Sequence, residues 1–317
     1  AQESRGLGDV YKRQMTNSMM KTNYLFIGMA ALMIAACSNN ENEPQVDDGR
    51  IAVSFAGEIT LPRATTDTWE ANDGIGIYML EHGMKTVTDG ATNRKYVTTA
   101  GDGKFTPAGT EQTIYFPLNA DEKVDFIAYY PQTDLTDDIY KVDVSDQKAP
   151  ADIDLLRSDN ATGKDKSTNT VDLKFFHRLS RVEVELTAGE GVSDTELAGM
   201  GITLGQQPVK ADFNVLQNTL TAEQGLTSLT LNTAADGKTA SAIILRQEGA
   251  NGRNLKLTLT GGTVLTWPVE AERTFEQGKK TVFTITLKRT PVGTEVEVNA
   301  TIQPWDTQGT VSGDLEI

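Results

Sequence analysis

The single cysteine of this 317-residue chain, Cys37, lies in the setting that most clearly indicates a covalent reaction. It follows the apolar stretch 24–36, which ends in Ile34-Ala35-Ala36, and it precedes the polar run 38–43. The stretch is too short for a membrane-spanning helix, which needs roughly 20 residues, and it fits the apolar part of a secretory signal peptide. Small residues directly before such a cysteine form a lipobox. We therefore predict that a diacylglycerol is attached to the sulfur by a thioether bond; the alternative is a buried cysteine in an N-terminal helix.

The two histidines, His82 and His177, offer little material for catalysis or metal binding. They are far apart in the sequence, and Cys37 is assigned to the lipid, so no His/Cys cluster or paired nucleophile has a useful spacing. We interpret His82 as an exposed loop residue and His177 as a strand-edge residue. The sequence thus predicts no enzyme activity, no metal and no cofactor other than the covalent lipid.

Three short motifs imitate functional sites but stand in the wrong context. Ser145-Asp-Gln-Lys148 and Ser158-Asp-Asn160 resemble motifs of penicillin-recognising serine enzymes, yet both fall in one polar stretch without a helical pattern. The glycines of 199–205 lack the spacing of a phosphate-binding loop. Asp134, Asp137 and Asp138 lack the ligand spacing of a calcium loop. We assign no chemistry to any of them.

The net charge of −15 excludes nucleic acid as a partner, because an acidic surface repels polyanions. With one cysteine, the chain has no intramolecular disulfide, so its stability must come from hydrophobic cores. The length that follows residue 50 suits two domains of ordinary size.

The elements that must support any function are strands. Apolar residues alternate with polar ones from Ile51 onward, as in Val182-Glu-Val-Glu-Leu186 and Leu255-Lys-Leu-Thr-Leu259, which is the pattern of half-buried strands. Turn signals such as Asn72-Asp-Gly74 separate them, and helical periodicity is nearly absent. Many short strands of this kind predict an all-β chain built from β-sandwiches.

We predict five segments from these patterns. The polar run 159–170 is taken as the boundary between two domains. The segments are a sequencing-adaptor artefact (1–14), a lipoprotein signal peptide (15–36), a flexible tether (37–50), an N-terminal β-sandwich (51–168) and a C-terminal β-sandwich (169–317).

Six further stretches occur in an order shared with a known family. They are Ile59-Thr-Leu-Pro-Arg-Ala64, Trp69-Glu-Ala-Asn-Asp-Gly-Ile-Gly-Ile-Tyr-Met79, Tyr115-Phe-Pro117, Phe126-Ile-Ala-Tyr-Tyr-Pro131, Phe175-Phe-His-Arg-Leu-Ser-Arg-Val182 and Ile302-Gln-Pro-Trp305. Together with the lipobox, the chain resembles the fimbrillin-like pilins of Bacteroidales, the subunits of type V pili. The resemblance runs from the signal peptide to the C-terminus.

This resemblance implies two transthyretin-like sandwiches in tandem and an exported outer-membrane lipoprotein that contributes to adhesion at the cell surface. It also implies that a trypsin-like protease cuts after an arginine that follows the first strand. Here the cut would fall between Arg63 and Ala64 and release the lipidated piece. An extended segment of the next pilin subunit would then fill the vacated place.

The residues of the first strand make this exchange physically reasonable. Ile51, Val53, Phe55 and Ile59 share one face with Leu61, so emptying their place would expose on the order of 10 kcal/mol of apolar surface. An open sheet edge also invites strand addition. A candidate donor is the C-terminal tail, in which Val311, Leu315 and Ile317 alternate with polar residues.

Other interpretations stay open. Arg63 has the alternative of an ordinary loop arginine beside Pro62, and the tail that of a resident last strand. The chain could be a monomeric surface module that binds glycans through Trp69, Tyr129 and Trp267. It could also be an anchor or tip pilin that keeps its first strand and stays lipidated.

Overall fold

The computed structural model describes residues 49–60, 68–249, 251–290 and 293–304, and the chain within these ranges is almost entirely β. The helical elements there are short: α1 (Pro150–Ile153), α2 (Asp194–Leu197) and the 3-10 turn η1 (Thr110–Gln112). The described residues belong to one compact unit, Asp47–Ile317. The all-β class predicted from the alternation is confirmed.

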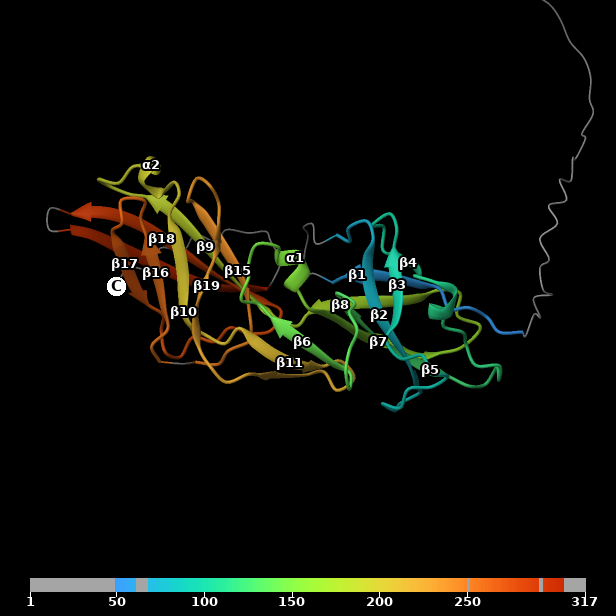
Figure 1. Cartoon of the computed structure of the whole chain (residues 1–317). Coiled ribbons are helices and arrows are strands. Elements are labelled where there is room, and N and C mark those ends of the chain that lie inside the picture. The colour runs from blue at the N-terminus through green and yellow to red at the C-terminus, as the bar shows by residue number, and fades with distance from the viewer. Residues whose placement is uncertain (1–48, 61–67, 250, 291–292, 305–317) are drawn as a thin grey trace, which may run out of the picture. The chain divides into compact units, whose positions relative to one another are not determined.

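Seven strands close into a barrel (Figure 1). Around the barrel their order is β1 (Phe55–Ile59), β4 (Lys104–Pro107), β3 (Arg94–Thr98), β2 (Asp73–Glu81), β5 (Val124–Tyr130), β7 (Leu156–Lys164) and β8 (Val171–His177). β1 closes the barrel because it pairs antiparallel with β4 and parallel with β8. On β8, Val171, Leu173 and Phe175 are buried and the residues between them are exposed, since alternate side chains of a strand point to opposite faces.

The remaining strands form three sheets, with orders β13-β10-β16-β17, β12-β11-β6 and β14-β15-β9-β18-β19. Their bounds are β6 (Ile139–Asp143), β9 (Ser180–Ala188), β10 (Gly201–Gln207), β11 (Lys210–Asn214), β12 (Thr219–Ala222), β13 (Thr227–Thr230), β14 (Asn232–Thr233), β15 (Thr239–Ile244), β16 (Asn254–Thr258), β17 (Val264–Pro268), β18 (Lys279–Thr290) and β19 (Gly293–Pro304). The four-stranded and five-stranded sheets share one core, which includes Val184, Leu204, Leu255 and Phe283. These two sheets therefore pack as a sandwich.

A third hydrophobic cluster joins barrel residues to the three-stranded sheet. Tyr78 on β2 and Tyr129 on β5 lie in this cluster with Val142 on β6 and Phe213 on β11. The hydroxyl of Tyr78 donates a hydrogen bond of 2.9 Å to Asp138. Burial, together with this bond, raises the pKa of Tyr78, so the hydroxyl stays a donor over the usual pH range.

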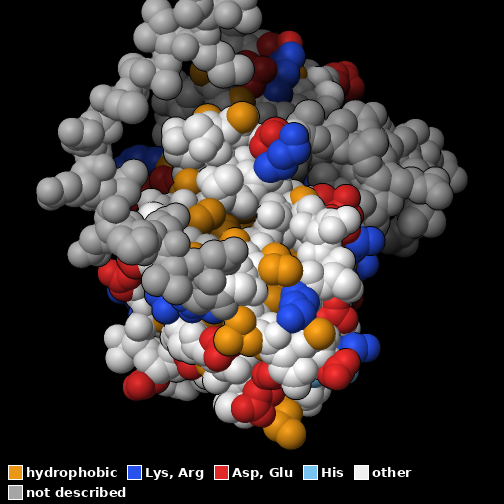
Figure 2. All heavy atoms as spheres, turned by 90° about the vertical axis from the view of Figure 1, so that its right-hand side faces the viewer, with side chains coloured by type: hydrophobic (Ala, Val, Ile, Leu, Met, Phe, Trp, Pro, Cys, Tyr) orange, Lys and Arg blue, Asp and Glu red, His pale blue; other side chains and the backbone are white. Residues whose placement is uncertain are grey.

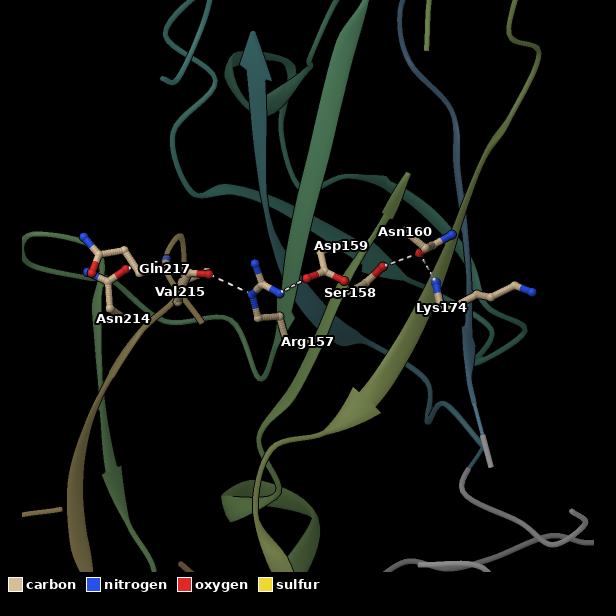
Figure 3. A network of polar contacts seen from close by, with 8 residues as sticks. All are labelled: Arg157, Ser158, Asp159, Asn160, Lys174, Asn214, Val215 and Gln217. Atoms are coloured by element: carbon tan, nitrogen blue, oxygen red, sulfur yellow. Dashed lines mark hydrogen bonds and ion pairs between the residues drawn. The ribbon is translucent and has the colours of Figure 1, made fainter. Parts of the chain in front are cut away.

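Arg157 on β7 is fully buried and connects the barrel to the segment that follows β11 (Figure 3). Its Nε donates to the carbonyl of Val215 at 2.8 Å, and its Nη1 donates to Asp159. Burial lowers the pKa of the neighbouring Arg178 to about 10, and the charge of Arg157 adds to that effect. Because a buried guanidinium is costly without an opposite charge, Asp159 is the group that stabilises this pair of cations.

The predicted domain boundary after residue 168 does not match the strand pairing. β8 lies beyond that boundary, yet it pairs with β1 and β7 inside the barrel. The run 159–170 is part of β7 and its connection to β8, and an exposed connection of this kind is as polar as a linker. The seven barrel strands also close rather than remaining two open sheets, so the predicted tandem of two sandwiches is not confirmed.

Candidate functional site

The candidate site is the place that residues 53–59 occupy in the barrel wall, which we call the first-strand slot. Along β8 the partners run from Phe55 with Val171 to Ile59 with Phe175, and along β4 Phe55 faces Phe105. The backbone bonds continue on both sides of β1: Val53 N–H donates to Ile114 at 2.9 Å, and Thr60 N–H donates to Phe175 at 2.8 Å. Removing this segment would therefore leave β4 and β8 as two unpaired edges.

Two side chains of the segment insert fully into the barrel core. Val53 is 4% exposed and Phe55 is 2% exposed. The Phe55 ring makes edge contacts with Tyr96 at 5.0 Å and with Phe126 at 5.1 Å between centroids. Burial raises the pKa of Tyr96, and the hydroxyl accepts a 2.8 Å hydrogen bond from the Ile114 N–H, so this wall of the slot is neutral.

Ile51 was predicted to be buried on the same face as Val53 and Phe55, and this prediction is wrong. Ile51 is 47% exposed, while Ile59 is half-buried against the barrel core. Ile51 precedes β1, and near it the chain pairs through the isolated bridge of Ala52 with Tyr115 rather than within the barrel wall. Only Val53 and Phe55 are fully buried, so exposing the apolar surface of the slot costs about 3 to 6 kcal/mol. This is less than the cost of about 10 kcal/mol expected from the sequence.

Gly57 marks the narrowest point of the slot. A Cβ placed on it would lie 2.9 Å from the Phe105 ring and 3.1 Å from the Phe175 ring. Both rings are buried, and each makes an edge contact with Trp69 at 5.1 Å between centroids. Trp69 in turn donates a 2.7 Å hydrogen bond from Nε1 to the Gly57 carbonyl. The rings are therefore held from behind, and no side chain fits at this position without displacing them.

A pocket of about 520 Å³, which the sequence did not predict, lies at the start of the segment. Its lining includes Arg50, Arg94, Tyr115 and Leu118. The Arg50 guanidinium lies over the Tyr115 ring at 4.6 Å, and Leu118 is 60% exposed.

The other predicted site residues lie outside the described residues. These are Cys37, Arg63, Ala64, Val311, Leu315 and Ile317. The segment is described up to Thr60, three positions before Arg63.

The histidines differ from each other. His82 is exposed, as predicted, and its Nδ1 lies 2.8 Å from Asp125. His177, interpreted as a strand-edge residue, is the last residue of β8 and is buried: its side chain is 3% exposed and its Nδ1 lies 2.9 Å from Asp154. Burial follows from the alternation of β8, in which His177 continues the inward set of Val171 and Phe175.

None of the imitated motifs forms a reactive site. Ser158 is fully buried, and its hydroxyl donates a hydrogen bond to Asn160 (Figure 3). The backbone N–H of Ser145 donates a hydrogen bond to Asp143 in an exposed turn. Most of the stretch 199–205 lies within strand β10, and no helix follows it directly. Among the residues that the structure describes, no group of His, Cys, Asp and Glu is placed to hold a metal ion. Within the same ranges, no helix has the length and apolar character to span a membrane.

The rings proposed as a glycan platform are not free surfaces. Trp69 is 7% exposed and Tyr129 is fully buried. Trp267 is half-buried and packs on Phe283 at 5.7 Å between centroids. On the face shown in Figure 2, the hydrophobic side chains of the described residues lie singly or in small groups among charged ones. The glycan-binding interpretation thus loses the observation that motivated it.

Comparison with known proteins gives matches over most of the chain. The profile of the fimbrillin-like family matches residues 62–305. A Bacteroides uniformis protein proposed as fimbrium subunit Fim1C is 37% identical over 300 residues, which cover 90% of this chain and 95% of that protein. A proposed cell adhesion protein of Bacteroides uniformis, known from its crystal structure, has a TM-score of 0.71 at 36% identity and covers 82% of this chain and 100% of its own. One from Bacteroides ovatus has a TM-score of 0.67 at 21% identity, covers 82% of this chain and 99% of its own, and shares the fold.

Proposed function

The chain belongs to the fimbrillin-like family, and on that premise we propose that it is a structural subunit of a surface fimbria that polymerises by strand exchange. Members of this family are structural proteins rather than enzymes. The relatives named as fimbrium and cell adhesion proteins support a role in adhesion.

The observation that carries the proposal is the position of β1. It is the strand that closes the barrel, it is the first described strand of the chain, and the sequence Arg63-Ala64 follows it after a short stretch. A cut there leaves β1 held by non-covalent contacts alone. These are the backbone bonds to β4 and β8 and the burial of Val53 and Phe55.

The exchange has a clear driving force. Once β1 leaves, the edges of β4 and β8 and the apolar slot between them are exposed to water. An extended segment of another subunit that binds there covers the slot and pairs with both edges. The incoming strand restores the hydrogen bonds and the burial that β1 supplied. The equilibrium between a slot filled by β1 and a slot filled by a strand of another subunit therefore depends on how well each strand fits.

Lipid attachment at Cys37 fits the same sequence of events. In this proposal the precursor is exported by its signal peptide and held at the outer membrane by lipid on Cys37. A trypsin-like protease then cuts after Arg63. Because Cys37 and β1 lie on the same side of that cut, the anchor leaves with the strand. The lipid serves delivery to the surface and is lost when the subunit assembles.

The test is limited proteolysis of the purified precursor with a trypsin-like protease, followed by N-terminal sequencing and by electrophoresis without heating. We expect a new N-terminus at Ala64 and a ladder of assemblies. Arg63→Gln should abolish both, whereas Arg50→Gln, which alters the other arginine near β1, should abolish neither. A product that starts at Ile51, or mature surface protein that retains the piece from Cys37 to Arg63, contradicts the proposal and favours a non-polymerising anchor or tip.

A further inference from the structure

The pocket of about 520 Å³ beside residues 50–53 has the size of a site for a small ligand, since such sites occupy about 300 to 1,000 Å³. Met79 and Phe116 line it and are buried, so its floor is apolar. Asn119 and Glu122 also line it and are exposed, so its edge is polar. The proposed strand exchange assigns no role to these side chains.

Arg94 on β3 is a cation held in place at this pocket. Its Nη1 donates to the carbonyl of Glu111 at 2.7 Å, and its Nη2 donates to the carbonyl of Gly90 at 3.0 Å. A guanidinium has five N–H donors, so others remain for a ligand. Within the described residues, no carboxylate forms an ion pair with Arg94. An arginine fork binds a carboxylate or a phosphate with two parallel bonds, so Arg94 fits an anionic group of this kind.

The edge of the pocket selects among such anions. Asp89 and Glu122 line it and are exposed, and their carboxylates would repel a phosphate but accept hydrogen bonds from hydroxyl groups. The polar edge also offers no continuous apolar wall to the chain of a fatty acid. An acidic sugar satisfies both parts of the pocket, because it carries one carboxylate and has hydroxyls around the rest of its ring. We propose that this pocket binds an acidic sugar, with the sugar carboxylate on Arg94 and ring hydroxyls on Asp89 and Glu122.

The segment before β1 supplies one wall of this site. Arg50 lies over the Tyr115 ring at 4.6 Å, and both residues line the pocket. The backbone holds the two together, since the Phe116 N–H donates to the Ile51 carbonyl at 2.9 Å and Ala52 pairs with Tyr115. A ligand that needs this wall binds only while the segment is in place, and by linkage it opposes release of the segment. This consequence rests on the proposed strand exchange, whereas the binding itself does not.

The central test is calorimetric titration of the uncut protein with methyl glucuronide and with methyl glucoside. The two sugars share the same ring, and the first alone carries a carboxylate. We expect the glucuronide to bind and the glucoside to bind at least about tenfold more weakly, because hydrogen bonds to a charged partner are the stronger ones. Equal binding of the two sugars, or equally tight binding of inorganic phosphate, overturns the assignment to an acidic sugar. Binding of neither sugar overturns the site.

Variants of the pocket give a second readout. Arg94→Gln should remove most of the affinity for methyl glucuronide, and Lys95→Gln, at the exposed next position, should not. Because Arg94 also holds two carbonyls, Leu118→Asp provides a test that removes no hydrogen bond. Leu118 is 60% exposed at the pocket, and a carboxylate there should weaken binding by about fivefold through repulsion. Leu226→Asp, at a position 56% exposed outside the pocket lining, is the matched control. Unchanged affinity in Arg94→Gln and Leu118→Asp overturns the proposed site.

Release of the cleaved segment tests the wall that Arg50 forms. At about ten times its own dissociation constant, methyl glucuronide should lower the dissociation constant of the cleaved segment by about tenfold. Methyl glucoside at the same concentration is the control, and Arg50→Gln should remove the effect. If the glucuronide binds the uncut protein and release is unchanged, the role given to Arg50 is overturned. If the cleaved segment is never released, even without sugar, the proposed strand exchange fails while the titration still decides the site, so the two failures are distinguishable.

Discussion

Replacing Phe55 with alanine should weaken the hold of β1 on the barrel more than any other single change in the segment. The ring is 2% exposed and contacts Tyr96 and Phe126 edge-on. Truncation of a buried phenylalanine to alanine costs about 3 to 5 kcal/mol, because the lost transfer energy is joined by the cost of the cavity. After cleavage the segment is a separate peptide, so this cost falls on its binding. We expect the dissociation constant of the cleaved segment to rise by about a hundredfold to several thousandfold.

The assay follows release of the cleaved segment from the barrel by size-exclusion chromatography. Glu58→Ala is the matched control, since Glu58 is exposed on the same strand and its contact with Lys174 is a loose surface pair at 3.8 Å. Such pairs contribute about 0 to 1 kcal/mol, so release should change by less than about fivefold. The reasoning is refuted if Phe55→Ala releases the segment no faster than Glu58→Ala.

Three further predictions concern other parts of the chain. Gly57→Val should lower the thermal unfolding midpoint of the uncut protein, by an amount that corresponds to about 1 to 3 kcal/mol, because the side chain meets the two phenylalanine rings; an unchanged midpoint would show that the slot is wider than described. Burial alone would raise the pKa of Asp159, but the hydrogen bond and the charge of Arg157 outweigh burial, so the pKa is lowered overall. The stabilisation that Asp159 provides should therefore be complete above the unfolded pKa of about 4 and be lost as the pH falls through the lower folded value. Urea unfolding should thus show a difference between wild type and Asp159→Asn at neutral pH that shrinks below about pH 4, and a difference independent of pH would contradict this. Cys37→Ser should move the precursor from the detergent phase to the aqueous phase in a detergent partition experiment, and a variant that stays in the detergent phase would require another anchor.

The sequence allowed the strands to be predicted wherever one face of a sheet is buried. Val182, Val184 and Leu186 are the inward residues of β9, and Leu255 and Leu257 those of β16, because period-two alternation directly reports burial on one face. Val53 and Phe55 were placed correctly in the same way. The order of the six sequence motifs supplied the family resemblance.

What the sequence did not reveal depends on partners distant in the chain. The parallel pairing of β1 with β8 joins residues 55–59 to residues 171–175, and no local pattern indicates that a barrel closes there. The burial of Arg157 likewise depends on Val215, and that of His177 on the packing of β8 and Asp154. Gly57 carries no turn signal, so its steric role became visible only when Phe105 and Phe175 were placed around it.

The most direct test of strand exchange is a cryo-electron microscopy map of the assembled fimbria at side-chain resolution. The account predicts that the subunit begins at Ala64 and that the strand between β4 and β8 belongs to a neighbouring subunit. A map in which residues 53–59 of the same subunit still occupy that place would contradict it.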